Sequence, residues 1–137
     1  MQDFPIQSVS DLEKISNAVK WQYFEKLVAF IFRENGFDAK QNIVVKDSYG
    51  NKRQFDVIAK RYGITYLVEC KKWKSNERKS ALKSSVKKHL ERCVLYEGLH
   101  GPGTPLIVTL LDDNIAEHEG VVIVPIMKLN SYINDAL

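Results

Sequence analysis

The sequence has little of several features that would place it in a specialised class. Its 137 residues include only two cysteines, Cys70 and Cys93, and these do not stand in a CxxC-type spacing. We therefore expect neither a disulfide framework nor a zinc site, and we expect a reducing, cytoplasmic location. The longest apolar runs, residues 27–32 and 121–127, are far too short to cross a bilayer, so no membrane partner is expected.

The chain also lacks repeats, low-complexity tracts and any stretch composed like a domain linker. With 45% hydrophobic and 27% charged residues, a chain of this length can bury a core of its own. Residues 1–11 show no basic region followed by an apolar run, so no signal peptide is expected. We expect a single domain over residues 1–137, with a helical extension at 1–19 and a core at 20–135.

What the chain does contain is an alternation of helical and strand patterns. Ser10 and Glu13 stand at capping-box spacing, which predicts a helix that begins near Asp11. The apolar stripe runs to Asn35-Gly36, a typical stop, and fits either one bent helix or two. The order of the patterns predicts an α/β domain with a mixed central sheet flanked by helices. Strands are predicted over 37–45, 54–60, 64–70, 105–110 and 121–126, helices over 77–96 and 127–136, and a short helix or loop over 112–120.

Three charged residues interrupt the apolar pattern of residues 55–74, FDVIAKRYGITYLVECKKWK. Alternation along the second predicted strand of this segment puts Glu69 and Lys71 on one face, about 7 Å apart. If Tyr62-Gly63 forms a two-residue turn, the resulting hairpin register puts Asp56 directly across from Glu69. The sequence therefore predicts a cluster of Asp56, Glu69 and Lys71, provided that the register does not slip.

Two carboxylates this close repel each other unless a positive charge lies between them. Mg²⁺ suits this position, because it takes hard oxygen ligands and is usually held by one or two carboxylates plus substrate phosphate. Lys71 could orient or deprotonate an attacking water, or stabilise charge on a phosphate. The cluster predicts a site for phosphodiester hydrolysis. The alternative is a structural ion cluster in which Lys71 neutralises Asp56 or Glu69.

Positive charge is concentrated next to this cluster, although the whole chain carries only +3. Residues 71–92 hold nine Lys or Arg and two Glu, whereas residues 112–137 hold five acidic residues and one lysine. Such a polarised face is typical of proteins that bind a phosphate backbone, and a solvated helix face is the alternative. The candidate DNA-binding residues are Lys72, Lys74, Lys79, Lys83 and Lys87; the last three form an i, i+4 row beside an apolar row of Leu82, Val86, Leu90 and Val94.

Asp56, twelve intervening residues and then Glu69-Cys70-Lys71 resemble the D-x(n)-E-x-K signature of the PD-(D/E)xK nuclease superfamily. The likeness covers roughly residues 20 to 135 and is closest to the archaeal Holliday junction resolvases and the Mrr-type restriction endonuclease catalytic domains. WQYFEKLVAFIFRENGFDA (21–39) resembles the helix and first strand there, YLVECKKW (66–73) the core strand, and VVIVPIMKLNSYI (121–133) the closing strand and helix.

The resemblance implies a restriction-endonuclease-like fold and DNA cleavage that depends on Mg²⁺, with Mn²⁺ as a substitute. Asp56 and Glu69 would hold the metal with the backbone carbonyl of Cys70, Lys71 would be the catalytic lysine, and Glu25 would be an auxiliary metal or water ligand. The chain departs from the Mrr type at Glu69, where glutamine is usual, and this brings the segment nearer to the resolvases.

Cleavage of two strands needs two active sites, and one domain with a single Asp-Glu-Lys set supplies one. A two-fold homodimer is therefore expected. The candidate patch comprises residues 121–126 with Leu129, Tyr132, Ile133 and Leu137; the alternative is that these side chains close the monomer's own core. Two other functions stay open: a catalytically silent nucleic-acid-binding or assembly subunit on the same fold, and an unrelated α/β protein whose charge cluster is structural.

Overall fold

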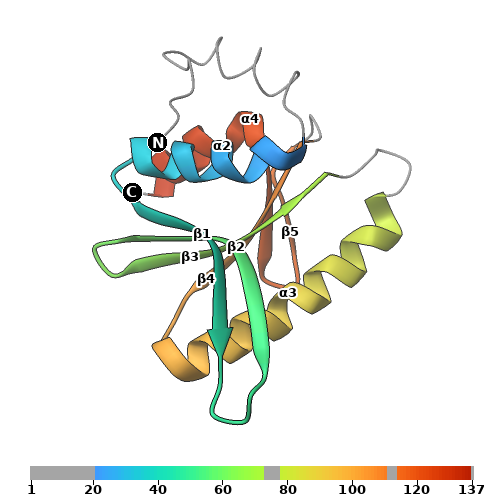
Figure 1. Cartoon of the computed structure of the whole chain (residues 1–137). Helices are drawn as coiled ribbons and strands as arrows, with labels where there is room; N and C mark the ends of the chain where they lie inside the picture. Colours follow the sequence, from blue (N-terminus) through green and yellow to red (C-terminus); the bar gives the residue numbers. More distant parts are fainter. Residues whose placement is uncertain (1–20, 73–77, 111–113, 137) are drawn as a thin grey trace.

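The computed structural model describes residues 21–72, 78–110 and 114–136, which form a mixed six-stranded sheet with helices on both faces (Figure 1). The strand order is β1-β2-β3-β4-β6-β5. β1, β2 and β3 are antiparallel neighbours, β3, β4 and β6 are parallel, and β5 is an antiparallel edge strand. The elements are α2 (Trp21–Glu34), β1 (Asp38–Lys46), β2 (Lys52–Arg61), β3 (Ile64–Lys71), α3 (Arg78–His100), β4 (Thr104–Thr109), β5 (Ala116–His118), β6 (Val121–Pro125) and α4 (Ile126–Ala136).

The predicted α/β architecture is confirmed, and so is the predicted stop of the first helix. Gly36 has φ +83°, its N–H donates to the carbonyl of Arg33 at 3.0 Å, and the N–H of Phe37 donates to the carbonyl of Phe32 at 3.1 Å. These two bonds satisfy the last carbonyls of α2 and turn the chain into β1. The predicted helix start near Asp11 and the extension at 1–19 lie outside the described residues.

The two faces of the sheet bury different amounts of apolar surface. α2 and α4 cover one face, and α3 crosses the other (Figure 1). Nineteen buried residues form one continuous cluster on the α2–α4 face, with Phe32 and Leu129 among the fully buried side chains. The α3 face holds two smaller clusters, of six and four buried residues, one around Leu67 and one around Ile107. No helix of the described ranges is both long and apolar enough to cross a membrane.

Two predicted details of these elements are wrong. Val94 is 68% exposed, whereas Val86 is buried, because each i+4 step advances about 40° beyond a full turn and an i, i+4 row drifts off the buried face. In place of Val94, Cys93 and Tyr96 pack against the sheet. In the predicted helix or loop at 112–120, Ala116–His118 is a short strand instead, since it pairs with β6 at the sheet edge.

The predicted dimer patch is also wrong. β6 lies between β4 and β5 rather than at an edge. Val121, Val124, Leu129 and Ile133 are each fully buried in the chain's own core, and Leu137 lies outside the described residues. These side chains close the chain's own core, and a homodimer stays a prediction.

Candidate active site

The hairpin between β2 and β3 has the register that the sequence predicts. Arg61 pairs with Ile64 and Ile58 pairs with Leu67. Tyr62 and Gly63 form the turn with φ +47° and +82°, which are the positive values that a two-residue turn of this kind requires at both positions. Continued by two residues beyond Ile58 and Leu67, the register brings Asp56 level with Glu69.

Asp56 lies at a break in the alternation of its strand. β1 and β2 pair in the same register before and after Asn42 and Asp56, but these two residues, which would face each other, are not paired. Asn42 has φ +53°. Val57 belongs to the cluster under α2, whereas Phe55, two residues earlier, belongs to a cluster under α3. Strict alternation would put both on the same face. The break releases Asp56 from the ladder.

The freed Asp56 side chain bonds to the neighbouring strand. Its Oδ2 accepts the backbone N–H of Cys70 at 2.7 Å, which fixes the carboxyl beside the end of β3. Burial raises the pKa of Asp56, while this hydrogen bond and nearby positive charges oppose the rise. A cation next to a half-buried carboxyl with a raised pKa would stabilise its ionised form.

Glu25, which the resemblance assigns as an auxiliary ligand, reaches this carboxyl from α2. Burial raises the pKa of Glu25, and so do the charge of Asp56 and the hydrogen bond between the two side chains. The two carboxyls therefore lie close enough to repel each other when both are charged. A divalent cation bound between them would relieve this repulsion.

Glu69 and Lys71 lie together on the α3 face of β3, as predicted. Lys71 Nζ lies 3.6 Å from Glu69 Oε1, with the Lys71 side chain 33% exposed and the Glu69 side chain 10% exposed. The positive charge of Lys71 also lowers the pKa of Asp56. The structure therefore brings Asp56, Glu69 and Lys71 to one end of β3, and adds Glu25 from the other layer.

Two residues of α3 complete the site, and the sequence reasoning did not identify them. Arg92 Nη1 donates to Glu69 Oε2. His89 is fully buried; its Nε2 lies 2.8 Å from the carbonyl of Leu67, and its Nδ1 lies 3.6 Å from Glu69 Oε2 and has no hydrogen-bond partner. Because a carbonyl only accepts, Nε2 carries the proton, and burial lowers the pKa of His89 to about 4.

A signal for these residues is present in the sequence. Ser85, His89 and Arg92 stand at i, i+4 and i+7, the spacing of one helix face, and Ser85 is buried as well. A stripe of polar residues on a helix that packs on a sheet indicates a buried polar cluster. The predicted apolar row of the same helix holds at Val86, Leu82 and Leu90 and fails only at Val94, and it does not identify these polar residues.

The donor chemistry of the site fits a hard divalent cation. Asp56 on β2, Glu69 on β3 and Glu25 on α2 supply carboxyl oxygens, and both Glu25 and Asp56 have raised pKa values. In the part of the chain that the structure describes, however, no three acidic, histidine or cysteine side chains converge as a closed metal site. The Glu69 carboxylate contacts Arg92 and Lys71 instead.

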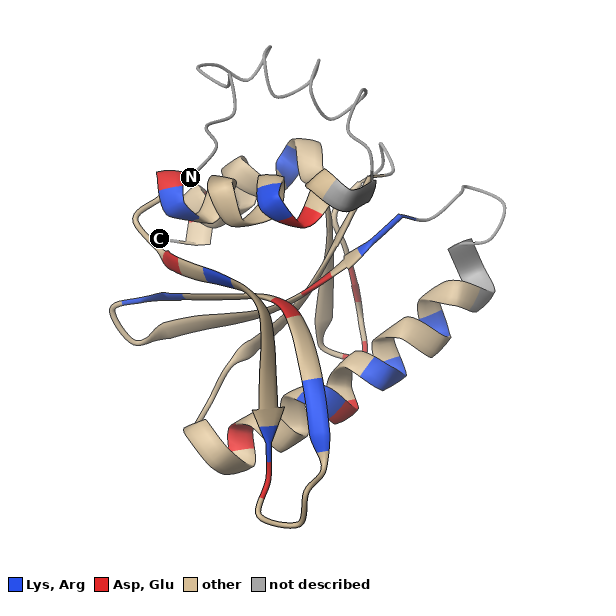
Figure 2. Cartoon of the chain, in the orientation of Figure 1, with Lys and Arg blue, Asp and Glu red and all other residues tan. Residues whose placement is uncertain are grey.

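The candidate DNA-binding lysines extend from the site along α3. Figure 2 shows Lys and Arg along much of α3 and at the end of β3. Lys72, Lys83 and Lys87 are exposed. Lys79 lies within α3, and Lys74 lies outside the described residues. The described lysines therefore form an exposed basic surface that begins at Lys71.

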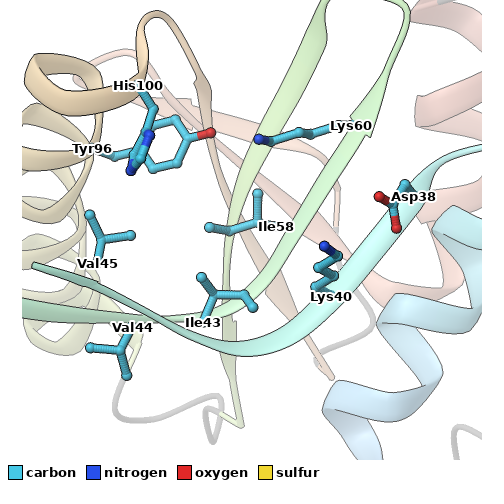
Figure 3. A pocket seen from close by; sticks show the side chains of 9 residues that line it. All are labelled: Asp38, Lys40, Ile43, Val44, Val45, Ile58, Lys60, Tyr96 and His100. Atoms are coloured by element: carbon cyan, nitrogen blue, oxygen red, sulfur yellow. The ribbon is translucent and has the colours of Figure 1, made fainter.

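A separate cavity of about 270 Å³ opens between the β1–β2 hairpin and the C-terminal end of α3 (Figure 3). Lys40, Lys60, Tyr96 and His100 are among its lining residues. The acidic residues and arginine of the site do not line it, so this cavity is not the acidic site.

Comparisons with known proteins bear on the family and the fold of the chain. A family model described as restriction endonuclease (Mrr_cat) matches residues 16–95. An uncharacterized protein of Archaeoglobus fulgidus is 34% identical over 119 residues, which are 85% of this chain and 92% of that protein.

Two solved structures are also similar. The small subunit (R.BspD6I2) of the heterodimeric restriction endonuclease R.BspD6I matches with a TM-score of 0.62 at 16% identity, over 95% of this chain and 77% of that one. This likeness shows a restriction-endonuclease-like fold. A protein of unknown function, AF1548, is 29% identical with a TM-score of 0.49 over 64% of this chain, which spans only 46% of that chain's length.

Proposed function

Because the chain belongs to the Mrr-type restriction endonuclease family, we propose that it is a metal-dependent endonuclease that hydrolyses phosphodiester bonds in DNA. The membership confirms the PD-(D/E)xK resemblance, and of the two types that the sequence resembles the family match is to the Mrr type. The observation that carries the proposal is the meeting of Asp56, Glu69 and Lys71 at the end of β3, with Glu25 bonded to Asp56. The cytoplasmic location expected from the sequence is part of the same proposal.

The carboxyls would hold Mg²⁺, or Mn²⁺ in its place. Asp56 and Glu69 would be ligands together with the carbonyl of Cys70, and Glu25 would bind the ion or a water beside it. When bound, the ion acts as a Lewis acid on the phosphodiester. The break at Asp56 positions its carboxyl for this role, since the N–H of Cys70 holds Oδ2 in place.

Lys71 would act on the reacting groups. Its side chain is one-third exposed and 3.6 Å from Glu69, so it can reach solvent from a position beside the carboxylate. An ammonium in this position can orient the attacking water and stabilise negative charge that develops on the phosphate. The exposed lysines of α3 would bind the DNA backbone on either side of the scissile bond.

The experiment is a cleavage assay on linear, supercoiled and branched DNA, with Mg²⁺, with Mn²⁺ and with EDTA. We expect cleavage only with a metal ion, and loss of cleavage in Asp56→Ala, Glu69→Ala and Lys71→Ala. Glu91→Gln is the matched control, because Glu91 is an exposed acid of α3. Undiminished cleavage by Glu69→Ala would remove this assignment of the site.

The basic surface is tested by the salt dependence of DNA binding. Lys83→Gln/Lys87→Gln should weaken binding and lower the log–log salt slope by about 0.9 for each phosphate that the protein no longer neutralises. Lys46→Gln/Lys52→Gln removes the same charge at the far end of the β1–β2 hairpin and should leave the slope unchanged. Equal effects of the two double variants would mean that net charge, rather than the α3 face, governs binding.

A catalytically silent DNA-binding or assembly subunit is the second candidate function. Two observations favour it: Arg92 engages Glu69, and no three acidic, histidine or cysteine side chains form a metal-binding group within the described ranges. DNA binding without cleavage under all metal conditions would support the silent subunit.

The homodimer that the sequence predicts is tested by sedimentation with and without DNA. A single species of 15.7 kDa would exclude the homodimer.

A further inference from the structure

Arg92 is a cation of the site to which the proposed hydrolysis assigns no role. It lies on α3, and its Nη1 donates to Oε2 of Glu69. Its side chain is 25% exposed, and that of Glu69 is 10% exposed. Burial raises the pKa of Asp56, and the positive charge of Arg92 opposes that rise. Arg92 therefore acts on both acids that would hold a metal ion.

Both carboxylate oxygens of Glu69 already have partners within the protein. Oε1 faces Lys71 Nζ at 3.6 Å, and Oε2 accepts from Arg92. Both oxygens are thus engaged by cations, which is consistent with the lack of a closed metal site in the described ranges. A divalent ion that took Glu69 as a ligand would have to compete with Arg92 for Oε2.

His89 ties α3 to β3 close to Glu69. It is fully buried, and its Nε2 donates to the carbonyl of Leu67 at 2.8 Å. This bond ties α3 to β3 two residues before Glu69. Arg92 follows His89 by three residues, so it lies on the same face of α3 and meets the carboxylate.

We propose that Arg92 is a reversible counter-ion of Glu69, which a divalent metal ion displaces and which then binds a phosphate of DNA. This inference rests on the proposed function and deepens it, because it names the group that couples metal binding to DNA binding at the same site. A guanidinium suits both partners, since its five N–H donors match carboxylate and phosphate oxygens equally well.

The charge balance of the site gives the physical reason for coupling. The Glu69 carboxylate contacts two cations, Lys71 and Arg92. A divalent ion bound at Glu69 would add positive charge beside both, which favours release of Arg92 toward an anionic phosphate group.

The test is Mn²⁺ binding to the metal-free protein without DNA, measured by the electron paramagnetic resonance signal of free Mn²⁺. Arg92→Gln should bind Mn²⁺ about tenfold more tightly than the wild type, because a positive charge next to the ligand is removed. Its affinity for DNA in the presence of Ca²⁺ should fall. A residue that only stabilised the fold would lower both affinities together.

Lys88→Gln is the matched control, since Lys88 is an exposed cation one turn earlier on α3. It should change the Mn²⁺ affinity by less than about twofold. Arg92→Lys keeps the charge without the planar fork, and it should bind Mn²⁺ like the wild type. If Arg92→Gln unfolds at a lower temperature, Arg92→Lys decides, and a tenfold change in its Mn²⁺ affinity would overturn the proposal.

Unchanged or weaker Mn²⁺ binding by a stably folded Arg92→Gln protein would overturn the proposal as well. If Asp56→Asn abolishes Mn²⁺ binding in that case, the proposed metal site stands and only the role of Arg92 falls. If neither the wild type nor Arg92→Gln binds Mn²⁺, both the role of Arg92 and the metal dependence of the proposed function fall.

Discussion

The two faces of the sheet, formed by the same strands, bury different kinds of side chain. The α2–α4 face is one apolar cluster in which Phe32, Phe37 and Tyr66 contact one another at ring-centroid distances of 5.3 to 5.7 Å. On the α3 face, His89 and Glu69 lie between two smaller clusters. The α2–α4 face packs apolar side chains throughout, whereas the α3 face buries a polar cluster among fewer apolar contacts.

This difference suggests separate roles: the α2–α4 face stabilises the fold, and the α3 face carries the candidate site. Apolar burial contributes roughly in proportion to area, so the continuous cluster supplies most of the folding free energy. The buried polar cluster contributes little net stability, because desolvation offsets the attraction between its charges. We therefore expect substitutions on the two faces to differ in size, and on the α3 face to separate stability from activity.

Phe32→Ala should have the largest effect, since it removes a fully buried ring at the centre of the aromatic cluster. We expect a loss of about 3 to 5 kcal/mol in the free energy of unfolding, measured by urea denaturation. Tyr49→Ala is the control, because Tyr49 is 90% exposed, and it should change stability by less than about 0.5 kcal/mol. A loss below about 1 kcal/mol for Phe32→Ala would mean that the α2–α4 face is not the main core.

Most of this architecture could be predicted from the sequence, because apolar periodicity reports which residues are buried. It predicts the long strands and the helix stop at Gly36. It failed at Ala116–His118, since a strand of three residues is too short to show a period. It failed at Val94, since the helix drifts relative to a strict i, i+4 row.

Gly103→Ala should have the next largest effect, and it tests how tightly the α3 face is packed. A β-carbon at Gly103 would lie 2.6 Å from Leu67 Cδ1 and 2.8 Å from Cγ, and Leu67 is fully buried. We expect a loss of about 1 to 3 kcal/mol from overpacking, measured by the same denaturation.

Gly98→Ala is the matched comparison for Gly103→Ala. Gly98 lies within α3, and a β-carbon there would meet no atom within 4 Å. Alanine favours a helix interior over glycine by up to about 1 kcal/mol, so this variant should gain stability. Equal effects of the two substitutions would mean that Leu67 yields freely and that the α3 face is loosely packed.

Asp56 offers a smaller effect that separates stability from activity. Burial raises its pKa, so its charge at neutral pH opposes folding, and Asp56→Asn should be at least as stable as the wild type. Asp56→Leu cannot accept the N–H of Cys70 and should be about 1 to 2 kcal/mol less stable than Asp56→Asn. Urea denaturation at pH 7 with EDTA measures the difference, and both variants should lose cleavage.

The candidate site was less predictable than the fold. The turn at Tyr62-Gly63 set the register that brings Asp56 level with Glu69, and this part was predicted from local sequence. Arg92 and His89 reach Glu69 only because α3 crosses back over the sheet between β3 and β4. The packing angle and rotation of a polar helix are set by tertiary contacts, which no local pattern reports.

The smallest effect concerns the two thiols, one on each face of the sheet. Cys70 belongs to the α2–α4 cluster and Cys93 to the cluster around Leu67, and both are buried. Burial raises the pKa of Cys93 to about 12, and it raises the pKa of Cys70 well above its usual range. Because the thiolate is the reactive form, neither cysteine of the native protein should react with iodoacetamide at pH 8.

The order in which the thiols become reactive then reports which face opens first. The α3 face is held by smaller apolar clusters, so in urea below the unfolding midpoint α3 should detach before α2 and α4 do. We expect Cys93 to be alkylated several-fold faster than Cys70 in that range, as measured by mass spectrometry of the modified peptides. Equal rates for the two thiols would show that the domain opens only as a whole, and earlier reaction of Cys70 would reverse the ranking of the two faces.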